Sequence, residues 1–180
     1  MSMYPIASQT ASSGSSITTF SNIPQTFTHL QIRVYGRSDY DRGSGNTVPV
    51  SLYCTFNGDG AANYSWHLLT GDGSTASSNN TANATGIHLS TSGLPAFRAP
   101  ANTFGNYVID ILDYANTNKY KTTKSLGGVD QNGSGALTFN SGNWRSTSAI
   151  TSIAVFCDGN FALGTRIDLY GISISNATGA

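Results

Sequence analysis

The stretch from Thr28 to Tyr35 reads THLQIRVY, and apolar and polar side chains alternate along it. Leu30, Ile32 and Val34 fall on one face of an extended chain, and the more polar side chains fall on the other. A period of two residues is typical of a β-strand with one buried face. We therefore expect a strand here whose apolar face lies in the core.

Similar runs extend outward from this strand, separated by segments rich in Gly, Asn, Asp and Ser. The four residues from Asn57 to Gly60 and the five residues 114–118 have the composition and length of hairpin turns. Residues 70–85 are nearly all small and polar, so we expect a long surface loop there. The expected strands are residues 17–20, 28–35, 48–56, 63–69, 86–90, 104–113, 119–126, 136–140, 149–157 and 165–174.

The composition points away from helix. The chain of 180 residues contains no glutamate, since all nine acidic residues are aspartate, and only three of its nine basic residues are lysine. Glu and Lys sustain exposed helix surfaces, whereas Ser, Thr, Asn, Asp and Gly favour turns and strand surfaces. We therefore predict an all-β fold, an antiparallel β-sandwich of about ten strands that is jelly-roll-like.

The length and the 38% hydrophobic content predict one domain with one core. Residues 1–15 are rich in Ser, Thr and Ala and show no period. They predict a flexible N-terminal arm that becomes ordered only when it docks on another molecule. The jelly-roll domain then comprises residues 16–180.

The charge balance limits the possible partners. The formal net charge is zero, and only 10% of the residues are charged. Without a basic field to attract phosphate groups, we expect neither nucleic acid nor a membrane as a partner. Sparse surface charge also gives little repulsion between copies, which favours assembly with other subunits. The N-terminus lacks the basic residues and the apolar run of a secretory signal, which predicts synthesis in a reducing cytoplasm.

Residues able to carry catalysis are few and scattered. His29, His67 and His88 show no metal-ligand spacing, and no Gly-x-Ser-x-Gly motif joins a strand to a helix. The loop from Asp39 to Asn46 could offer two aspartates to calcium, but it departs from the EF-hand pattern, and we interpret it as a turn-rich surface loop. The sequence therefore predicts no enzyme, with no catalytic residues, no cofactor and no metal, and calcium between Asp39 and Asp41 stays an alternative.

Cys54 and Cys157 each lie in an alternating apolar run. We expect both to point inward as small core residues. A disulfide between them stays an alternative that a reducing cytoplasm disfavours.

Aromatic residues indicate a second kind of function, because flat side chains on a β-sandwich can form platforms on which sugar rings stack. Trp66 alternates with Tyr64 and Leu68, so we expect it to pack within the sheet. We place Trp144 in an exposed turn over residues 141–146, where a partner can cover it. The candidate platform residues are Tyr40, Tyr53, Tyr64, Trp66, Tyr114 and Trp144.

Several blocks of the sequence also resemble a known group of proteins. They are FSNIPQTFTHLQIRVYGR at 20–37, FNGD at 56–59 with NYSWH at 63–67, DILDYANTNKYK at 110–121, and WRSTSAITSI at 144–153 with LYGI at 169–172. Together they are similar to segments of virion structural proteins of tailed bacteriophages, including cyanophages, and the likeness spans residues 16–174. The resemblance implies a β-sandwich subunit displayed on the virus particle, which either clamps capsid subunits or decorates the tail.

On this resemblance we expect a non-enzymatic virion protein, made in the bacterial host. The favoured role is a homotrimeric capsid cement or decoration protein that stabilises the head by burying surface across neighbouring copies of the major capsid protein. The alternative is a tail fibre, spike or baseplate component that binds host-surface carbohydrate, a polysaccharide. The candidate partner-contact residues are Tyr4, Pro5, Ile6, Tyr40, Trp144 and Arg145.

Overall fold

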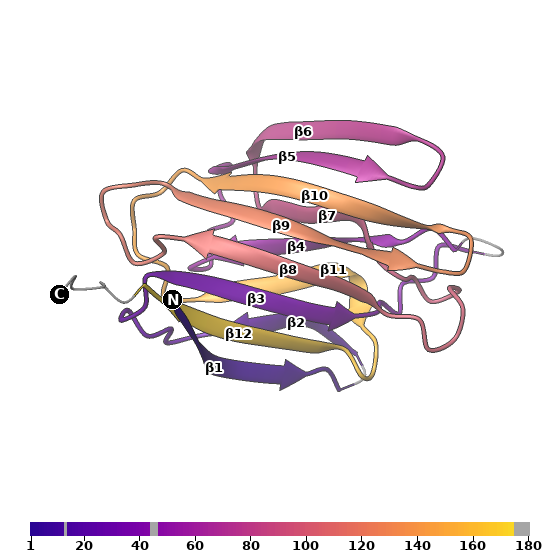
Figure 1. Ribbon diagram of the computed structural model, residues 1–180, viewed down its shortest axis with the longest axis horizontal. Coiled ribbons are helices and arrows are strands. Elements are labelled where there is room, and N and C mark those ends of the chain that lie inside the picture. The colour runs from indigo at the N-terminus through magenta and orange to yellow at the C-terminus, as the bar shows by residue number, and fades with distance from the viewer. Residues whose placement is uncertain (13, 44–46, 175–180) are drawn as a thin grey trace.

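The computed structural model describes residues 1–12, 14–43 and 47–174, which form two packed antiparallel β-sheets (Figure 1). Residues 13, 44–46 and 175–180, which belong to the predicted arm, loop and domain, lie outside the described residues. No helix occurs in the described part of the chain. The strands are β1 (Ser2–Thr10), β2 (Ser15–Phe20), β3 (His29–Gly36), β4 (Val50–Phe56), β5 (Tyr64–Gly71), β6 (Ala76–Ala84), β7 (Ile87–Leu94), β8 (Gly105–Leu112), β9 (Lys121–Asp130), β10 (Gly135–Trp144), β11 (Ile153–Phe161) and β12 (Arg166–Ser173).

The strand order identifies the sandwich as a jelly roll. Half of the larger sheet runs β1-β12-β3-β8, and the smaller sheet runs β2-β11-β4-β7. Eight strands in this arrangement form the two Greek keys of a jelly roll. Two further hairpins, β5–β6 and β9–β10, are inserted in the sequence and widen the larger sheet to eight strands (Figure 1). The all-β, jelly-roll-like sandwich predicted from the sequence is confirmed, with twelve strands instead of about ten.

The core lies between the facing surfaces of the two sheets. Leu30, Ile32 and Val34 of β3 are buried, as their alternation predicts. The predicted inward faces of β4 and β8 are buried in the same way, so the period of two is a reliable signal in the central strands. The remaining core includes Val50, Leu52, Cys54, Phe56, Tyr107, Ile109, Ile111, Ile153, Val155, Ile167 and Leu169.

Cys54 and Cys157 are free, buried cysteines on the neighbouring strands β4 and β11. Burial in an apolar environment raises the pKa of the Cys157 thiol to about 12, so this thiol is protonated at neutral pH. The prediction that both residues point inward is confirmed, and the alternative of a disulfide is not realised.

The N-terminal residues are not the predicted flexible arm. Ser2–Thr10 form β1, which pairs with β12 and is the first strand of the jelly roll. Ile6 and Ala7 are half-buried and pack against the core. An edge strand needs only one hydrogen-bonded neighbour, so it tolerates Pro5 and a largely polar sequence. This tolerance explains why no alternation marks the strand.

Residues 76–84 form a strand instead of part of the predicted loop. This strand, β6, pairs with β5 and is the outer edge of the larger sheet. The turn between them is held by the Asp72 carboxylate, which accepts hydrogen bonds from the backbone N–H groups of Ser74 and Thr75 at 2.9 and 2.7 Å. Most side chains of β6 are exposed, and small or polar residues occupy both of its faces. The sequence therefore lacks the alternation that would predict a strand here.

The predicted turn at Asn57 to Gly60 is present, but it does not close a hairpin. Asn57 and Gly58 have φ angles of 53° and 68°, the backbone conformation that Asn and Gly tolerate. The turn joins β4 of the smaller sheet to β5 of the larger one. The prediction of a hairpin here is therefore wrong, whereas the hairpin predicted across residues 114–118 is confirmed as β8–β9.

The pairing of β1 makes a prediction about truncation. Removal of residues 1–10 should destabilise the domain by at least about 1 kcal/mol, because half-buried Ile6 loses its contacts. This loss corresponds to a fall in Tm of about 2–4 °C, measurable by calorimetry. In the full chain, Ile6→Ser should show part of the loss, and Thr10→Ala, at an exposed position of the same strand, should show none. An unchanged Tm of the truncated chain would mean that β1 does not contribute to the fold.

Candidate docking surface

The inserted β9–β10 hairpin turns polar side chains toward the interior. Ser125 on β9 and Thr138 and Asn140 on β10 are each no more than 1% exposed. The residues that alternate with them, Leu126 and Phe139 among others, face solvent. This arrangement reverses the usual pattern of a sandwich strand, in which apolar residues face inward.

The inward polar side chains contact β7, the edge strand of the smaller sheet. Ser125 Oγ donates a hydrogen bond to the Leu89 carbonyl oxygen at 2.8 Å, and Asn140 Nδ2 donates to the His88 carbonyl oxygen. An edge strand presents backbone groups that lack a strand partner. The hairpin side chains therefore satisfy carbonyl groups that another strand would otherwise bind.

A chain of buried hydroxyl groups continues the same contact. Tyr107 Oη donates to Ser90 Oγ at 2.8 Å, and Ser90 Oγ donates to Thr138 Oγ1 at 3.3 Å. Burial raises the pKa of the Tyr107 hydroxyl, which keeps it a hydrogen-bond donor. We call the contacts of Ser125, Asn140 and this hydroxyl chain the polar seam.

The polar seam should matter for stability more than exposed polar residues do. Ser125→Ala leaves the buried Leu89 carbonyl oxygen without this donor and should cost about 1–3 kcal/mol in the free energy of unfolding. Ser141→Ala, at an exposed position on the outer face of β10, should change it by less than about 0.5 kcal/mol. Urea unfolding of both variants measures the difference. Equal effects would contradict the role given to the seam.

The inward orientation of the polar residues leaves apolar ones on the outer face of the larger sheet. Leu69, Phe139, Leu126 and Val108 stand directly opposite one another on β5, β10, β9 and β8, and Leu137 lies beside them on β10. Their exposed fractions are 55%, 46%, 50% and 39%, with 63% for Leu137. We call these five residues the apolar row. Contiguous exposed apolar surface of this kind marks interaction sites on soluble proteins.

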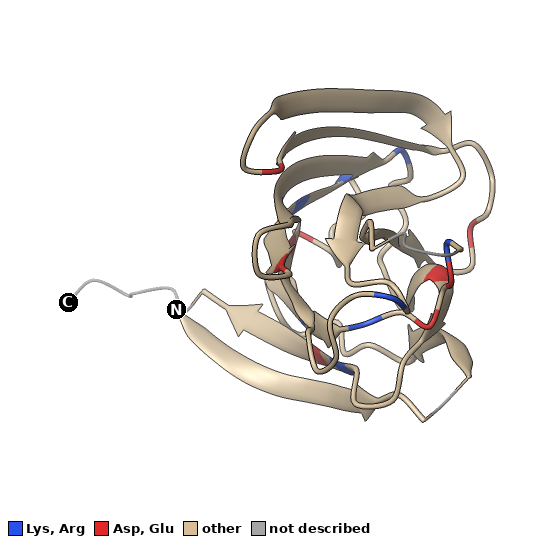
Figure 2. Cartoon of the chain, turned by 90° about the vertical axis from the view of Figure 1, so that its right-hand side faces the viewer, with Lys and Arg blue, Asp and Glu red and all other residues tan. Residues whose placement is uncertain are grey.

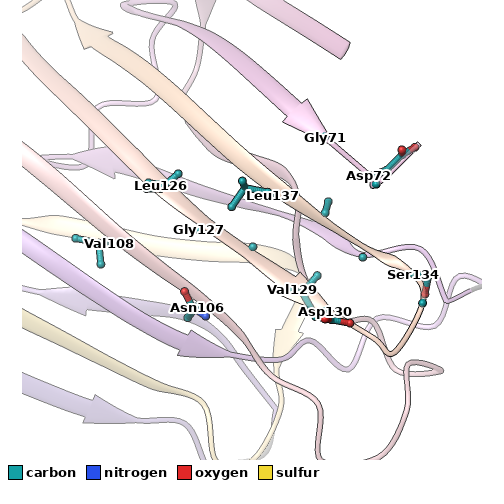
Figure 3. Close-up of a pocket in the computed structure, with 15 residues that line it drawn as sticks. Gly71, Asp72, Asn106, Val108, Leu126, Gly127, Val129, Asp130, Ser134 and Leu137 are labelled. Atoms are coloured by element: carbon teal, nitrogen blue, oxygen red, sulfur yellow. The ribbon is translucent and has the colours of Figure 1, made fainter. Parts of the chain in front are cut away.

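A hollow of about 760 Å³ adjoins the apolar row at one end (Figure 3). Val108, Leu126 and Leu137 line it from three neighbouring strands, and Asp130 lies at its far end (Figure 3). Gly128 in its lining allows β9 and β10 to approach closely, because a Cβ atom there would lie 2.3 Å from the Ala136 carbonyl oxygen. The hollow is concave, with apolar residues toward the row and Asp72 and Asp130 also in its lining, and it can receive a protruding side chain of a docking partner.

All nine aspartates accept hydrogen bonds from groups of the fold itself. Asp113, for example, accepts a hydrogen bond from Lys119 Nζ at 2.9 Å, which lowers the pKa of its carboxyl. In Figure 2 the charged residues are short scattered segments, and the outermost strand, β6, carries none. The acidic groups thus hold turns and ion pairs, and the candidate surface is apolar.

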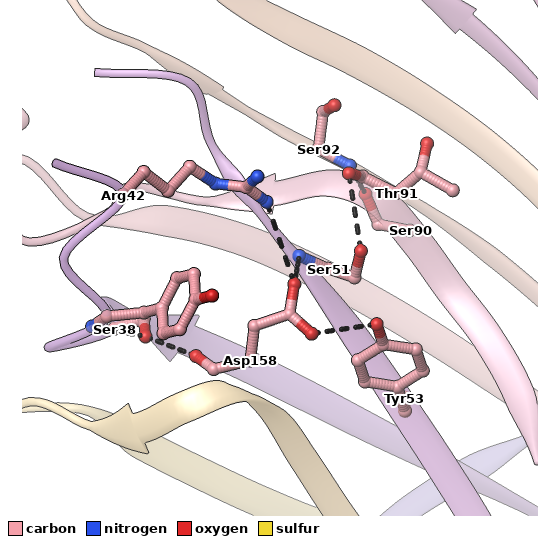
Figure 4. Close-up of polar contacts among 9 residues, drawn as sticks. Ser38, Arg42, Ser51, Tyr53, Ser90, Thr91, Ser92 and Asp158 are labelled. Carbon is pink, nitrogen blue, oxygen red and sulfur yellow. Dashed lines mark hydrogen bonds and ion pairs between the residues drawn. The ribbon is translucent and has the colours of Figure 1, made fainter. Parts of the chain in front are cut away.

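Asp158 ties the smaller sheet to the loop that follows β3 (Figure 4). Its carboxylate accepts hydrogen bonds from Tyr53 Oη at 2.8 Å and from the Ser51 backbone N–H at 3.1 Å, and it lies 3.7 Å from Arg42 Nη2. Ser38 Oγ donates to the Asp158 carbonyl oxygen at 2.6 Å. Burial raises the pKa of the Tyr53 hydroxyl, and the neighbouring carboxylate raises it further. These contacts form a structural cross-link between β11, β4 and the loop that follows β3.

The two aspartates of the predicted cation loop have separate partners. Asp39 accepts hydrogen bonds from the Asn160 backbone and side chain at 2.8 and 3.0 Å, whereas Asp41 accepts two from Arg98 at 2.6 and 2.8 Å. The Arg98 guanidinium lowers the pKa of the Asp41 carboxyl. Over the described ranges, no group of three or more His, Cys or Asp side chains is placed to hold a metal ion.

The predicted partner-contact residues do not gather at one site. Tyr4, Pro5 and Ile6 lie on β1 at one edge of the larger sheet, and Tyr4 stacks on Phe27 with ring centres 5.9 Å apart. Tyr40 lies in the loop after β3 and is 43% exposed.

Trp144 and Arg145 lie at the end of β10. In the larger sheet, β10 is four strands away from β12, the neighbour of β1. Arg145 is half-buried, and its Nη2 atom donates to the Ala62 carbonyl oxygen at 2.7 Å and to Asn83 Oδ1 at 2.8 Å. The predicted residues therefore belong to three separate regions of the surface and core.

Trp144 lies in the core, so the prediction of an exposed turn is wrong. It is 2% exposed, its ring centre lies 5.6 Å from that of Phe56, and it stacks on Tyr64 at 6.3 Å. Trp144 Nε1 donates a hydrogen bond to Asp59 Oδ2 at 2.8 Å. The strand β10 continues to residue 144, beyond its predicted end at 140, and this places Trp144 opposite Tyr64 within the sheet.

The apolar row could not be identified from alternation alone. Leu137 and Phe139 alternate with Thr138 and Asn140, and the period of two does not say which set faces the core. The usual assumption, apolar inward, gives the wrong orientation for this hairpin. The sequence signal is a run of Thr, Ser, Asn and Gly at alternate positions, 123, 125 and 127 on β9 and 138, 140 and 142 on β10.

His88 should make stability depend on pH near neutrality. Its ring stacks on Trp66 at 4.5 Å and meets Tyr53 edge-on at 4.4 Å, and burial lowers its pKa, although Asp158 opposes this shift. The unfolded chain therefore takes up a proton that the folded chain resists, so stability should fall as the pH drops below about 6.5.

His88→Phe keeps an aromatic ring and removes the titration. Between pH 7.5 and 5.5, the free energy of unfolding from urea denaturation should fall less for this variant than for the natural chain. His67→Gln, at an exposed position, is the matched control and should behave like the natural chain. Identical pH profiles for all three proteins would contradict the assignment.

Comparison with known proteins adds no family: the sequence matches no protein-family model, and no curated protein matches it. Among the described residues, no helix is long and apolar enough to cross a membrane. A function must therefore be argued from the surfaces described above.

Proposed function

We propose that this chain is a non-enzymatic structural protein of a bacteriophage virion, a homotrimeric decoration subunit that binds to the capsid. Its partners are the major capsid protein and other copies of itself. The apolar row is the observation that carries the proposal. Leucine, valine and phenylalanine side chains on four adjacent strands are exposed at 39–63% in the single chain, and a binding partner would remove them from water.

The geometry of the row favours docking by surface burial. The row crosses the β5, β10, β9 and β8 strands without a charged residue between its members, and the nearest charges on β8 and β9, Asp110 and Lys124, pair with each other beside it. The adjoining hollow adds shape that can fix the register of a partner. A subunit that repeats this contact over a lattice adds stabilising free energy with each copy, which suits a cement protein.

The fold and the use of the aspartates are consistent with this role. Jelly rolls recur in viral capsid proteins and lectins, although a fold alone does not establish a function. All nine aspartates are engaged in hydrogen bonds of the fold, which supports a binding role over acid–base catalysis. The resemblance to virion proteins supplies the particle on which the subunit would act.

A charge placed in the apolar row should weaken binding to the capsid. Leu126→Lys should reduce binding to particles that lack the protein by at least about tenfold, because the capsid would have to bury an unpaired ammonium group. Thr122→Lys adds the same charge on the same face of β9, outside the row, and should leave this binding unchanged.

Copy number separates the proposed role from the tail alternative. In quantified gels of purified virions, a decoration subunit should be present in numbers comparable with the major capsid protein, and a tail component should be far scarcer. A scarce protein would overturn the capsid assignment. A chain that is monomeric before any substitution would overturn the trimer.

A further inference from the structure

A second surface is a groove of about 610 Å³ between the inserted β5–β6 hairpin and the smaller sheet. One wall comes from β4, β7 and β11, and the other comes from β6 and the turn that follows it. Its volume falls within the range of small-molecule sites. The groove exists because the hairpin extends the jelly roll past the edge strand β7.

Aromatic rings form one side of the groove. Tyr53 and Phe156 are cross-strand partners whose rings stack at 5.2 Å with an interplanar angle of 13°. His88 meets Tyr53 edge-on at 4.4 Å and stacks on Trp66 at 4.5 Å. Tyr53, Phe156 and His88 are partly exposed, so apolar ring surface is available to a ligand.

Uncharged polar side chains form the opposite side. Asn79, Thr81 and Asn83 lie on β6, and Thr85 lies in the turn before β7. Arg145 donates a hydrogen bond to Asn83 Oδ1 at 2.8 Å, which orients that amide. The groove thus combines ring faces with amide and hydroxyl groups, and no lining residue carries a charge at neutral pH, since burial lowers the pKa of His88.

Two lining rings also carry unused hydrogen-bonding atoms. Trp66 Nε1 and His88 Nδ1 are buried and make no hydrogen bond with any described residue. Trp66 as a whole is 5% exposed. A buried polar atom without a partner is costly and calls for an explanation. A hydroxyl-rich ligand in the groove offers one, because it can supply donors and acceptors beside the rings.

These features select one class of ligand. Ring faces bind the apolar C–H face of a sugar, and amides and hydroxyls bind its hydroxyl groups. A phosphorylated or acidic ligand would need cationic side chains, which the lining lacks. A fully apolar ligand would leave the Asn and Thr groups unpaired. We infer that the groove between β6 and the smaller sheet binds a neutral saccharide, a site that goes beyond the proposed function and does not depend on it.

The test is a glycan array that carries neutral and acidic oligosaccharides, followed by calorimetric titration of the best neutral binder. Phe156→Ala removes a ring from the wall and should weaken binding about tenfold, the effect of one aromatic contact. Asn79→Ala should weaken it from the polar side without disturbing the rings. Because both positions are partly or fully exposed, the variants are expected to fold, and circular dichroism checks this.

The matched control is Tyr35→Ala. Tyr35 is an exposed aromatic on the larger sheet that stacks on Phe104 at 4.8 Å, so its loss mimics the Phe156 change outside the groove. The control should bind the saccharide like the natural chain. The absence of neutral glycan binding, a preference for acidic glycans, or binding that survives both groove variants would overturn the inference. Capsid attachment is measured separately with Leu126→Lys, so the failure of one proposal leaves the other standing.

Discussion

The polar seam between β7 and the β9–β10 hairpin is the contact on which the functional surfaces depend. Ser125 and Asn140 donate hydrogen bonds to carbonyl groups on the free edge of β7. Buried donors and acceptors are far more costly to leave unpaired than apolar residues are to expose. A slip of one residue in the hairpin would exchange its two faces, so these hydrogen bonds fix the register. The same register sends Leu126 and Phe139 to the surface.

Two inserted hairpins turn a common fold into one with specific surfaces. The eight jelly-roll strands supply most of the buried apolar core, with Leu30 and Ile109 fully buried. The β9–β10 hairpin carries the outward-facing apolar row beside β8. The β5–β6 hairpin extends the same sheet and forms the groove with the smaller sheet. Both candidate sites therefore come from the additions to the jelly roll, where packing of the central core constrains the sequence less.

Charge takes little part in either surface. The aspartates are committed to turns and ion pairs, as with Asp72 in the β5–β6 turn and Asp158 between β4 and β11. The apolar row offers area and shape to a partner, and the groove offers ring faces and amides. Recognition by this chain should consequently depend only weakly on salt, since screening acts on charges.

The sequence by itself determined the fold class and the central strands. The strands β3, β4 and β8 each have one face buried in the core. Because of that burial, apolar residues recur every second position, as Leu30, Ile32 and Val34 do in β3. The edge strands β1 and β6 carry no such period, because each has one neighbour and most of its side chains are exposed, which places few demands on them. Trp144 lies in the core because β10 continues to residue 144. The alternating pattern in the sequence predicted an end at residue 140 and so did not reveal this. Only the tertiary structure decided which face of β9 and β10 is inside, since alternation is symmetrical between the two faces and the polar edge of β7 breaks that symmetry.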